Sequence, residues 1–385
     1  MGKVEELLET YNPNGVSSIK LGDILDYEQP SKYIVSSSEY DDNYDIPVLT
    51  AGQSFILGYT DEKDGVYKAS KNNPTIIFDD FTTGHHWVDF DFKIKSSAMK
   101  MLRLKNDKSL LRYIFHSMAL IHYVPTEHSR QWISKYSQFE IPLPHIKVQE
   151  EIVKILDSFT NLIDALNEEL SLRQKQLEYY RDQLYDDLFK KTKGVDVLCF
   201  SELGQIERGK RFVRDDIKSH GQPCIHYGDM YTYYGVKSNK AKTYLDRDFP
   251  KKMRYADIGD VIIVGAGENN WDIGVGLAWL GEEPAAVHDA CYIVKHNNNP
   301  LFIAYYTRTT EYHQQLKKCV SEGKICSFSA EGLGKVTIPI PSLAIQQSIV
   351  EKLDAFESLI ASLKEEIALR QKQYEYYREK LLTFD

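Results

Sequence analysis

Basic residues interleaved with aromatic and amide side chains are the groups of this sequence with the clearest chemistry. Arginine and glutamine carry paired donors and acceptors that match the edges of guanine and adenine, whereas lysine holds phosphates without reading sequence. Such stretches indicate local contacts to DNA, although any single residue among them could equally be an ordinary solvated charge. The candidate DNA-binding residues are Lys210, Arg211, Arg214, Lys251, Lys252, Arg254, His128, Arg130, Gln131 and Lys324.

The motifs that would indicate catalysis or a bound cofactor all fail. Residues 204–210 have the spacing of a phosphate-binding loop, but Arg211 stands where a hydroxyl would meet magnesium. His85 and His86 are adjacent and would point in different directions on a strand. The five cysteines form no CxxC pair, so no zinc site is indicated. We therefore predict no catalytic residue, no metal site and no cofactor in this chain.

Composition sets the outer limits of the fold. The chain has 385 residues, 42% of them hydrophobic and 27% charged, which is enough for two or three folded domains. Its net charge of −9 disfavours a broad nucleic-acid-binding surface, so any such surface must be local. No apolar run approaches the roughly 20 residues of a membrane span, and the first residues do not resemble a signal peptide. We expect a cytoplasmic protein without a membrane partner.

An internal repeat organises the chain. A shift of 197 residues aligns residues 141–188 with 338–385 without a gap, and half of the aligned pairs are identical. Each copy opens with two prolines, in IPLP and IPIP, which favour an extended strand over a helix interior. About 40 residues without an internal glycine or proline follow, which predicts long helices near 146–190 and 343–385.

Apolar residues recur in steps of four and three along both predicted helices, which is typical of a coiled-coil seam. Such a narrow stripe must pack against a partner, and the other copy is the best candidate. The seam positions are Ile152, Leu156, Phe159, Ile163, Leu166, Leu170, Leu177, Tyr180 and Leu184 in the first copy, and Ile349, Leu353, Phe356, Ile360, Leu363, Ile367, Tyr374, Tyr377 and Leu381 in the second.

Both copies also keep an arginine in the seam and the phrase RQKQxEYYR around it. A buried arginine is unfavourable unless its head group reaches solvent or is paired. A second protein that touches this face would explain the retention, and packing within the chain would explain it equally well. The candidate partner-binding residues are Arg173, Gln174, Tyr180 and Arg181 with their counterparts Arg370, Gln371, Tyr377 and Arg378.

The regions before each helix look β-rich, because short apolar runs such as TIIF and DVIIVG lie between turn residues. A shift of 179 residues relates their beginnings, for example Ile19 to Leu198. The predicted class is α+β, with β-rich domains at 1–140 and 194–337 and helical regions at 141–193 and 338–385. The leading VEELLET should pack beside the carboxyl terminus, which gives a pseudo-circular plan with approximate twofold symmetry.

With this plan the sequence resembles the specificity subunits of type I restriction-modification systems over essentially its whole length. The most telling stretches are FEIPLPHIKVQEEIVKILDSFTNLIDAL, VTIPIPSLAIQQSIVEKLDAFESLIASL and NPNGVSSIKLGDI. The resemblance implies two target-recognition domains separated by two antiparallel helices that form a coiled coil. It also implies that each domain reads one half of a split, asymmetric site in double-stranded DNA.

The same resemblance implies the partners. Two methyltransferase subunits would dock on the helices, and restriction subunits would join them, while the specificity subunit itself catalyses nothing. S-adenosylmethionine, ATP and magnesium would belong to those partner subunits. Two alternatives stay open from the residues alone, a coiled-coil scaffold or dimerisation protein without sequence-specific DNA binding and a stand-alone DNA enzyme.

Overall fold

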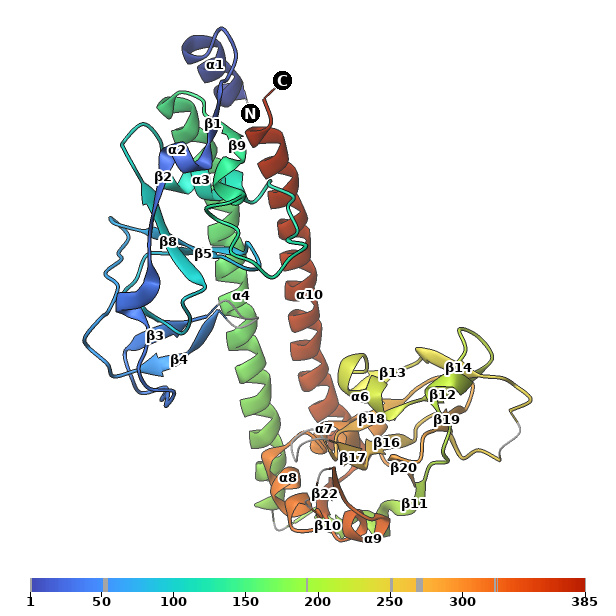
Figure 1. Ribbon diagram of the computed structural model, residues 1–385. Coiled ribbons are helices and arrows are strands. Elements are labelled where there is room, and N and C mark those ends of the chain that lie inside the picture. The colour runs from blue at the N-terminus through green and yellow to red at the C-terminus, as the bar shows by residue number, and fades with distance from the viewer. Residues whose placement is uncertain are drawn as a thin grey trace. The chain divides into compact units, whose positions relative to one another are not determined.

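The computed structural model describes residues 2–50, 55–191, 193–249, 252–267, 273–321, 323 and 325–384. It divides into two compact units, of which unit 1 comprises residues 1–166 and 366–385, and unit 2 comprises residues 167–365. Two long helices, α4 (Ile146–Phe189) and α10 (Leu343–Leu382), contribute one part to each unit (Figure 1). Their bounds agree with the predicted helices. Within the described ranges, no helix has a stretch long and apolar enough to cross a membrane.

Unit 1 contains a four-stranded sheet with the order β2-β8-β5-β6, a three-stranded sheet with the order β4-β3-β7, and the short pair β1-β9. Helix α3 packs on the first sheet and joins it to α4. The elements are α1 (Gly2–Tyr11), β1 (Ser18–Lys20), α2 (Leu21–Ile24), β2 (Leu25–Glu28), η1 (Pro30–Tyr33), β3 (Ile46–Leu49), β4 (Ile56–Thr60), β5 (Thr75–Asp79), β6 (His85–Val88), β7 (Lys93–Ile94), β8 (Met99–Leu104), α3 (Leu111–Met118), η2 (Tyr136–Gln138) and β9 (Glu140–Pro142).

Unit 2 contains sheets with the orders β11-β20-β16-β18-β13 and β14-β12-β19-β15, together with the short pairs β10-β22 and β17-β21. Its elements are β10 (Val195–Cys199), α5 (Phe200–Leu203), β11 (Gly204–Arg208), η3 (Arg214–Asp216), β12 (Gln222–Ile225), α6 (Tyr227–Thr232), β13 (Lys237–Ser238), β14 (Thr243–Leu245), β15 (Tyr255–Ala256), β16 (Val261–Val264), β17 (Ala266–Gly267), β18 (Gly276–Trp279), β19 (Ala285–Val287), β20 (Cys291–His296), α7 (Pro300–Tyr306), α8 (Thr310–Lys317), β21 (Cys326–Ser327), α9 (Ala330–Gly334) and β22 (Thr337–Pro341).

The two units share one connectivity. The order β2-β8-β5-β6 corresponds to β11-β20-β16-β18, and β4-β3-β7 corresponds to β14-β12-β19. In both three-stranded arrangements the first neighbour of the central strand is antiparallel and the second is parallel. The weak sequence relation between the two β-rich regions therefore reflects a duplicated fold, with extra strands in unit 2.

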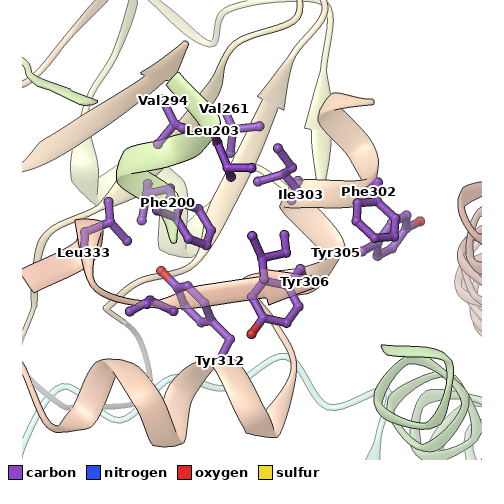
Figure 2. Close-up of a cluster of buried hydrophobic side chains, with 14 of the residues drawn as sticks. Phe200, Leu203, Val261, Val294, Phe302, Ile303, Tyr305, Tyr306, Tyr312 and Leu333 are labelled. Carbon is purple, nitrogen blue, oxygen red and sulfur yellow. The ribbon is translucent and has the colours of Figure 1, made fainter. Parts of the chain in front are cut away.

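The central strands are the predicted apolar runs. Every residue of β5 and of β16 is buried, as expected for strands covered on both faces. In unit 2 the core continues into α7 and α8, where the rings of Tyr306 and Tyr312 lie 6.4 and 5.9 Å from the ring of Phe200 (Figure 2). The hydroxyl of Tyr306 donates to the carbonyl of Thr337 at 2.6 Å, so the buried phenol is satisfied.

The predicted seam forms within each unit. In unit 1 the rings of Phe159 and Tyr377 stack with centroids 5.3 Å apart, and in unit 2 Tyr180 and Phe356 stack at 5.5 Å. The 197-residue shift relates Phe159 to Phe356 and Tyr180 to Tyr377, so the two stacked pairs are equivalent. The start of α4 therefore packs on the end of α10 in unit 1, and the end of α4 packs on the start of α10 in unit 2, as an antiparallel pair requires.

A buried glutamine fixes the start of each long helix. Gln149 in α4 is fully buried, donates to the carbonyl of Pro144 at 2.8 Å and accepts from the backbone of Leu110 at 3.0 Å. Its counterpart Gln346 in α10 donates to the carbonyl of Pro341 at 2.9 Å and accepts from the backbone of Asn299 at 2.9 Å. Each glutamine thus ties the proline-rich strand and the following long helix to the chain that enters α3 or α7.

About two turns further on, an aspartate of each long helix binds the β-rich region. In unit 1 Asp157 accepts from Arg112 at 2.7 Å and contacts the ring of His116 at 2.9 Å. In unit 2 Asp354 accepts from the hydroxyl of Tyr305 at 2.7 Å and from Lys237 at 2.6 Å. The aspartates are related by the repeat, whereas their partners are different residue types.

Helix α1 packs beside the carboxyl-terminal end of α10, as predicted from the sequence. Val4 is 4% exposed and belongs to the same apolar cluster as Leu381 and Leu382 at the end of α10. Lys3 also pairs with Glu151 of α4 at 2.9 Å. The two ends of the chain therefore lie together in unit 1 (Figure 1), in agreement with the pseudo-circular prediction.

Candidate nucleic-acid interface

A basic pocket lies on the surface of unit 2, with a volume of ≈ 560 Å³. It brings together two segments that are about forty residues apart in the sequence. Lys210, Arg211 and Lys252 are exposed, whereas Arg254 is half-buried. Four of the predicted DNA-binding residues thus share one site, whose lining residues are Lys210, Arg211, Lys252, Met253 and Arg254.

The backbone that carries Lys210 and Arg211 is held in place by its neighbours. Gly209 donates to the carbonyl of Cys291 at 2.9 Å, and Lys210 donates to the carbonyl of Val287 at 2.9 Å. A Cβ atom on Gly209 would lie 2.2 Å from the carbonyl oxygen of His288. Only glycine fits this close approach, which brings the basic segment against β19.

Phe212 anchors the same loop. Its ring is 1% exposed, packs with Cys224 and Ala286, and meets the ring of His288 edge-on with centroids 5.1 Å apart. The residues on both sides of this anchor, Arg211 and Arg214, point their charges outward. A rigid apolar anchor thus presents two guanidinium groups, the side chains best suited to paired contacts with a guanine edge.

Arg254 is the least available of the pocket's cations. Its Nη1 atom donates to the carbonyl of Arg208 at 2.5 Å, and its Nε atom lies 3.7 Å from a carboxylate oxygen of Glu207. The guanidinium is therefore directed partly back to its own domain. We expect it to support the positive potential of the pocket more than to contact a base.

An aromatic cluster that the sequence analysis missed adjoins this site. The rings of His226 and His288 lie 4.7 Å apart, and Tyr227 lies 4.5 Å from the first and 5.2 Å from the second. Burial lowers the pKa of both histidines, and the nearby Arg214 and Arg211 lower the pKa of His226 and His288 further. Both histidines are therefore neutral at neutral pH, and the exposed face of Tyr227 offers a stacking surface. The sequence HYGD carries no local signal for this contact.

The candidate residues of unit 1 separate into two groups. His128 is exposed and stacks on Phe81 with ring centroids 4.5 Å apart, and Arg130 is exposed. Gln131 is fully buried. Its amide nitrogen donates to the carbonyl of Ser129 at 2.7 Å, and its amide oxygen accepts from Tyr123 at 2.8 Å. Because both ends of this amide are used inside the protein, we leave Gln131 out of the proposed DNA-contacting surface.

The backbone at Gln131 is held by Asp80, about fifty residues earlier in the sequence. The carbonyl of Asp80 accepts from the backbone of Gln131, and its carboxylate accepts from the backbone of Trp132, both at 2.8 Å. The same carboxylate pairs with the buried Lys100 at 3.1 Å. Two further candidates, Lys251 and Lys324, lie outside the described residues.

The repeated arginine of the helices is paired along its own helix. Arg173 donates to Glu169 and to Gln176, and its counterpart Arg370 donates in the same way to Glu366 and Gln373. Both arginines are half-exposed. Each guanidinium therefore reaches solvent and forms an ion pair, so an arginine at this seam position is not unfavourable.

The other candidate partner residues lie partly on the exposed surface of the helices and partly in the seam between them. Gln174 and Gln371 are exposed, whereas Tyr180 and Tyr377 stack in the seam, as described above. Arg181 pairs with Asp182 at 3.0 Å, and Arg378 lies over the ring of Tyr374 at 5.2 Å.

Outward-facing apolar residues on the helices were missed by the sequence analysis. Leu172 is 59% exposed and Tyr179 is 62% exposed, and their counterparts Leu369 and Tyr376 are 53% and 58% exposed. Both helices thus present a leucine and a tyrosine seven residues apart on one face. In unit 2 this face includes a shallow groove lined by Glu169, Leu172, Arg173, Lys175, Gln176, Tyr179 and Tyr180.

The rejected catalytic motifs have other roles in the structure. Residues 204–208 form strand β11, so the apparent phosphate-binding spacing does not form a loop at a helix start. His85 and His86 lie in β6, where His86 stacks on Phe55 with ring centroids 4.0 Å apart. Among the described residues, no group of three or more histidine, cysteine or acidic side chains could hold a metal ion.

Comparison with known proteins decides the family. The model of the type I restriction modification DNA specificity domain matches residues 13–173 and again residues 192–369. The chain belongs to the type I restriction-modification DNA specificity family. The specificity subunit of the Escherichia coli type I restriction enzymes EcoR124I and EcoR124II is 38% identical to it over 416 residues, covering 100% of this chain and 97% of that protein.

Further relatives agree with this family. A putative type I restriction enzyme specificity subunit from Haemophilus influenzae is 30% identical, over 86% of both chains. The crystal structure of a type I restriction-modification S subunit from M. genitalium has a TM-score of 0.56 and 15% identity over 96% of both chains. A chain from a structure of the type I R-M system gives 0.52 and 17%, over 96% of this chain and 97% of the other. The specificity-subunit fold predicted from the sequence is confirmed.

Proposed function

We propose that this chain is the DNA sequence-specificity subunit of a type I restriction-modification complex and reads a bipartite, asymmetric site in double-stranded DNA. In this role the chain is non-catalytic, and the β-rich regions 1–140 and 194–337 are its two target-recognition domains. The proposal places the protein in the cytoplasm, where the host DNA lies. The observation that carries it is the basic pocket of unit 2, built on a fold that occurs twice in the chain.

The duplicated fold supports a bipartite site. The two units share strand order, whereas the loops that follow equivalent strands carry different side chains, such as Lys210 and Arg211 in unit 2 and Ser31 and Lys32 in unit 1. A shared scaffold with different surface residues suits two half-sites of different sequence. An asymmetric recognition sequence follows from that difference.

We assign DNA contacts to the exposed basic residues. In unit 2 the loop arginines Arg211 and Arg214 are suited to base edges, while Lys210 and Lys252 are suited to phosphates and Arg254 supports them. In unit 1 Arg130 and the stacked pair of His128 with Phe81 are exposed candidates for the other half-site. Lys251 and Lys324 remain in the proposal on their sequence context alone.

We assign the outer faces of α4 and α10 to two methyltransferase subunits, one on each copy of the repeat. The support is the equivalent exposure of Leu172 and Tyr179 on one helix and of Leu369 and Tyr376 on the other. Arg173, Gln174, Tyr180 and Arg181, with Arg370, Gln371, Tyr377 and Arg378, would frame these apolar positions. Restriction subunits would join this assembly, and S-adenosylmethionine, ATP and magnesium would be bound by the partner subunits.

The test is a genome-wide map of N6-methyladenine in the host, with this gene present and then deleted. We expect deletion to remove methylation from one split motif, made of two short defined blocks around a fixed undefined gap. Restoring the gene should restore that motif. Unchanged methylation, in a strain where the protein and a co-purifying methyltransferase are both produced, would contradict the proposal and favour a scaffold role.

A further inference from the structure

The loop that follows β2 in unit 1 has the same place in the fold as the basic loop that follows β11 in unit 2. Glu28 at the end of β2 faces Met101 of β8, and Glu207 near the end of β11 faces Ile293 of β20. The 179-residue shift seen in the sequence therefore also relates these strands. Under this shift Lys32 corresponds to Arg211.

An aromatic anchor accompanies the basic residue in both loops. Tyr33 corresponds to Phe212, and its ring packs edge-on against Tyr67 with centroids 4.9 Å apart, beside the cluster that contains Leu49. Its hydroxyl donates to Glu28 at 2.7 Å. Each loop is thus fixed by a ring inserted toward the smaller sheet, and the exposed cation precedes that ring.

Strand register identifies a second correspondence. In unit 1 Val48 of β3 faces Lys93 of β7, and in unit 2 Cys224 of β12 faces Ala286 of β19, both in parallel pairs. These pairs occupy the same place in the shared strand order. The residues just before them, Phe92 and Ala285, are therefore equivalent.

The antiparallel partners of Phe92 and Ala285 give a further pair of equivalent residues. Phe92 forms an antiparallel bridge with Tyr67, and the first residue of β19 is paired in the same sense with Ala256. Tyr67 and Ala256 therefore correspond. Four residues before each of them stand Lys63 in unit 1 and Lys252 in unit 2, and both lysines are exposed.

The two unit 1 segments lie against each other, as the two halves of the basic pocket do in unit 2. Gly65 has a φ of +61°, and a Cβ atom there would lie 2.4 Å from the carbonyl oxygen of Lys32. A glycine is therefore needed for the turn that follows Lys63 to reach the loop of Lys32. Lys32 also lines a surface hollow together with Arg103 and the acidic residues Asp26 and Glu28.

A buried lysine keeps this turn in position. Lys93 is 3% exposed, donates to the carbonyl of Asp64 at 2.7 Å and pairs with Glu62 at 2.7 Å. Glu62 also accepts from the backbone of Ser36 and Ser37. The charge of Glu62 is thus neutralised inside the protein and is not directed at Lys63.

We propose that Lys32 and Lys63 are the DNA-contacting pair of the first recognition domain and bind phosphates of its half-site, as the counterparts of Arg211 and Lys252. This inference rests on the proposed function. A lysine ammonium is a point charge that holds phosphate without the paired geometry of a guanidinium. The pair therefore contributes affinity in unit 1, and base discrimination there comes from other side chains.

The test measures binding of the chain, assembled with its methyltransferase subunits, to a DNA duplex that carries the methylated motif. Each phosphate contact contributes about 0.9 to the slope of log affinity against log salt. The variant Lys32→Ala/Lys63→Ala should therefore lower that slope by about 2 and weaken binding on the order of tenfold at physiological salt. The loss should be equal for the motif and for a scrambled duplex.

The controls separate this inference from the proposed function. Lys71→Ala removes an exposed lysine of the same loop region and should bind like the wild type. Lys32→Arg/Lys63→Arg keeps both charges and should also retain the slope, which excludes a folding defect as the cause. If the double alanine variant binds normally while Arg211→Ala is weakened, the inference is overturned. If neither variant is weakened, the proposed interface itself fails.

Discussion

The two units of this chain are held to their helices by the same helix residues but by different residues of the β-rich regions. Asp157 binds an arginine and a histidine in unit 1, and its counterpart Asp354 binds a tyrosine and a lysine in unit 2. Gln149 and Gln346, by contrast, make equivalent bonds in both units. The helices thus repeat the same residues in both units. Each recognition domain binds the equivalent helix aspartate with side chains of different types.

The largest expected effect concerns the two buried glutamines, which make equivalent hydrogen bonds in both units. Gln149→Ala should lower the free energy of unfolding by about 2–4 kcal/mol, because buried backbone donors and acceptors lose their partners. Gln346→Ala should have an effect of the same size. Hydrogen exchange should locate the first loss in unit 1 and the second in unit 2, and Gln174→Ala, at an exposed position, should change little. Equal loosening of both units by either variant would show that they do not fold separately.

The two outer helix faces should behave as equivalent docking sites. Tyr179→Ala and Tyr376→Ala should each weaken attachment of one methyltransferase subunit by about 2 kcal/mol, which is about 30-fold, since an exposed tyrosine is a typical anchor of an interface. Native mass spectrometry should show complexes with one methyltransferase copy for each single variant and none for the double variant. Lys364→Ala on the exposed part of α10 is the matched control. Loss of both copies from one substitution would contradict two independent sites.

The recognition surfaces should differ in what they contribute. Arg211→Ala should weaken DNA binding by about 1–3 kcal/mol and relax the preference at one base position if this arginine reads a guanine. Binding to duplexes with each base changed in turn would locate that position, with Lys218→Ala as the control. An equal loss on every sequence would make Arg211 a phosphate contact, like the lysines proposed for unit 1.

The smallest expected effect is a difference in acid sensitivity between the contacts of Asp157 in unit 1 and those of Asp354 in unit 2. Burial holds the pKa of His116 below its ordinary 6.5, so the ring is neutral at neutral pH and accepts from the hydroxyl of Tyr374 at 2.9 Å. Tyr374→Phe should lower the free energy of unfolding by about 1 kcal/mol at neutral pH, because it removes this donor. Urea unfolding of the variant and the wild type would measure this difference.

The sign of the pH effect follows from the lowered pKa. Below about pH 6.5 the unfolded chain binds the proton more readily than the folded chain, so this contact stabilises less as the pH falls. Hydrogen exchange in α3 should therefore rise with acid more than in α7, because the corresponding contact of Asp354 contains no histidine. His116→Gln should reduce the difference, and an unchanged difference would contradict this assignment.

Much of the fold could be predicted because its signals are local. The alternating steps of four and three and the preceding prolines gave the long helices to within a few residues, since these patterns depend only on neighbouring positions. The apolar runs of β5 and β16 and the packing of α1 near the end of α10 followed from the same kind of signal.

The site was harder to predict because it depends on residues far apart in the sequence. Both halves of the basic pocket were named, but only their separate contacts with β19 bring them together, since Val287 bonds to the backbone of both Lys210 and Arg254. Gln131 was a candidate DNA contact beside Arg130, yet its buried amide binds Ser129 and Tyr123 within the protein. Lys32 and Lys63 have no adjacent basic residues that would mark them, and only strand register pairs them with the basic residues of unit 2.

The composition of unit 1 has a consequence for how the protein is made. Its core includes Tyr374, Leu381 and Leu382 from the last part of the chain, together with Val4 from the first. The segment that forms unit 2 is continuous, so it can fold as soon as it leaves the ribosome, whereas unit 1 must wait for residues 366–385. A stop codon just before residue 366 would therefore damage the unit whose first part is synthesised first.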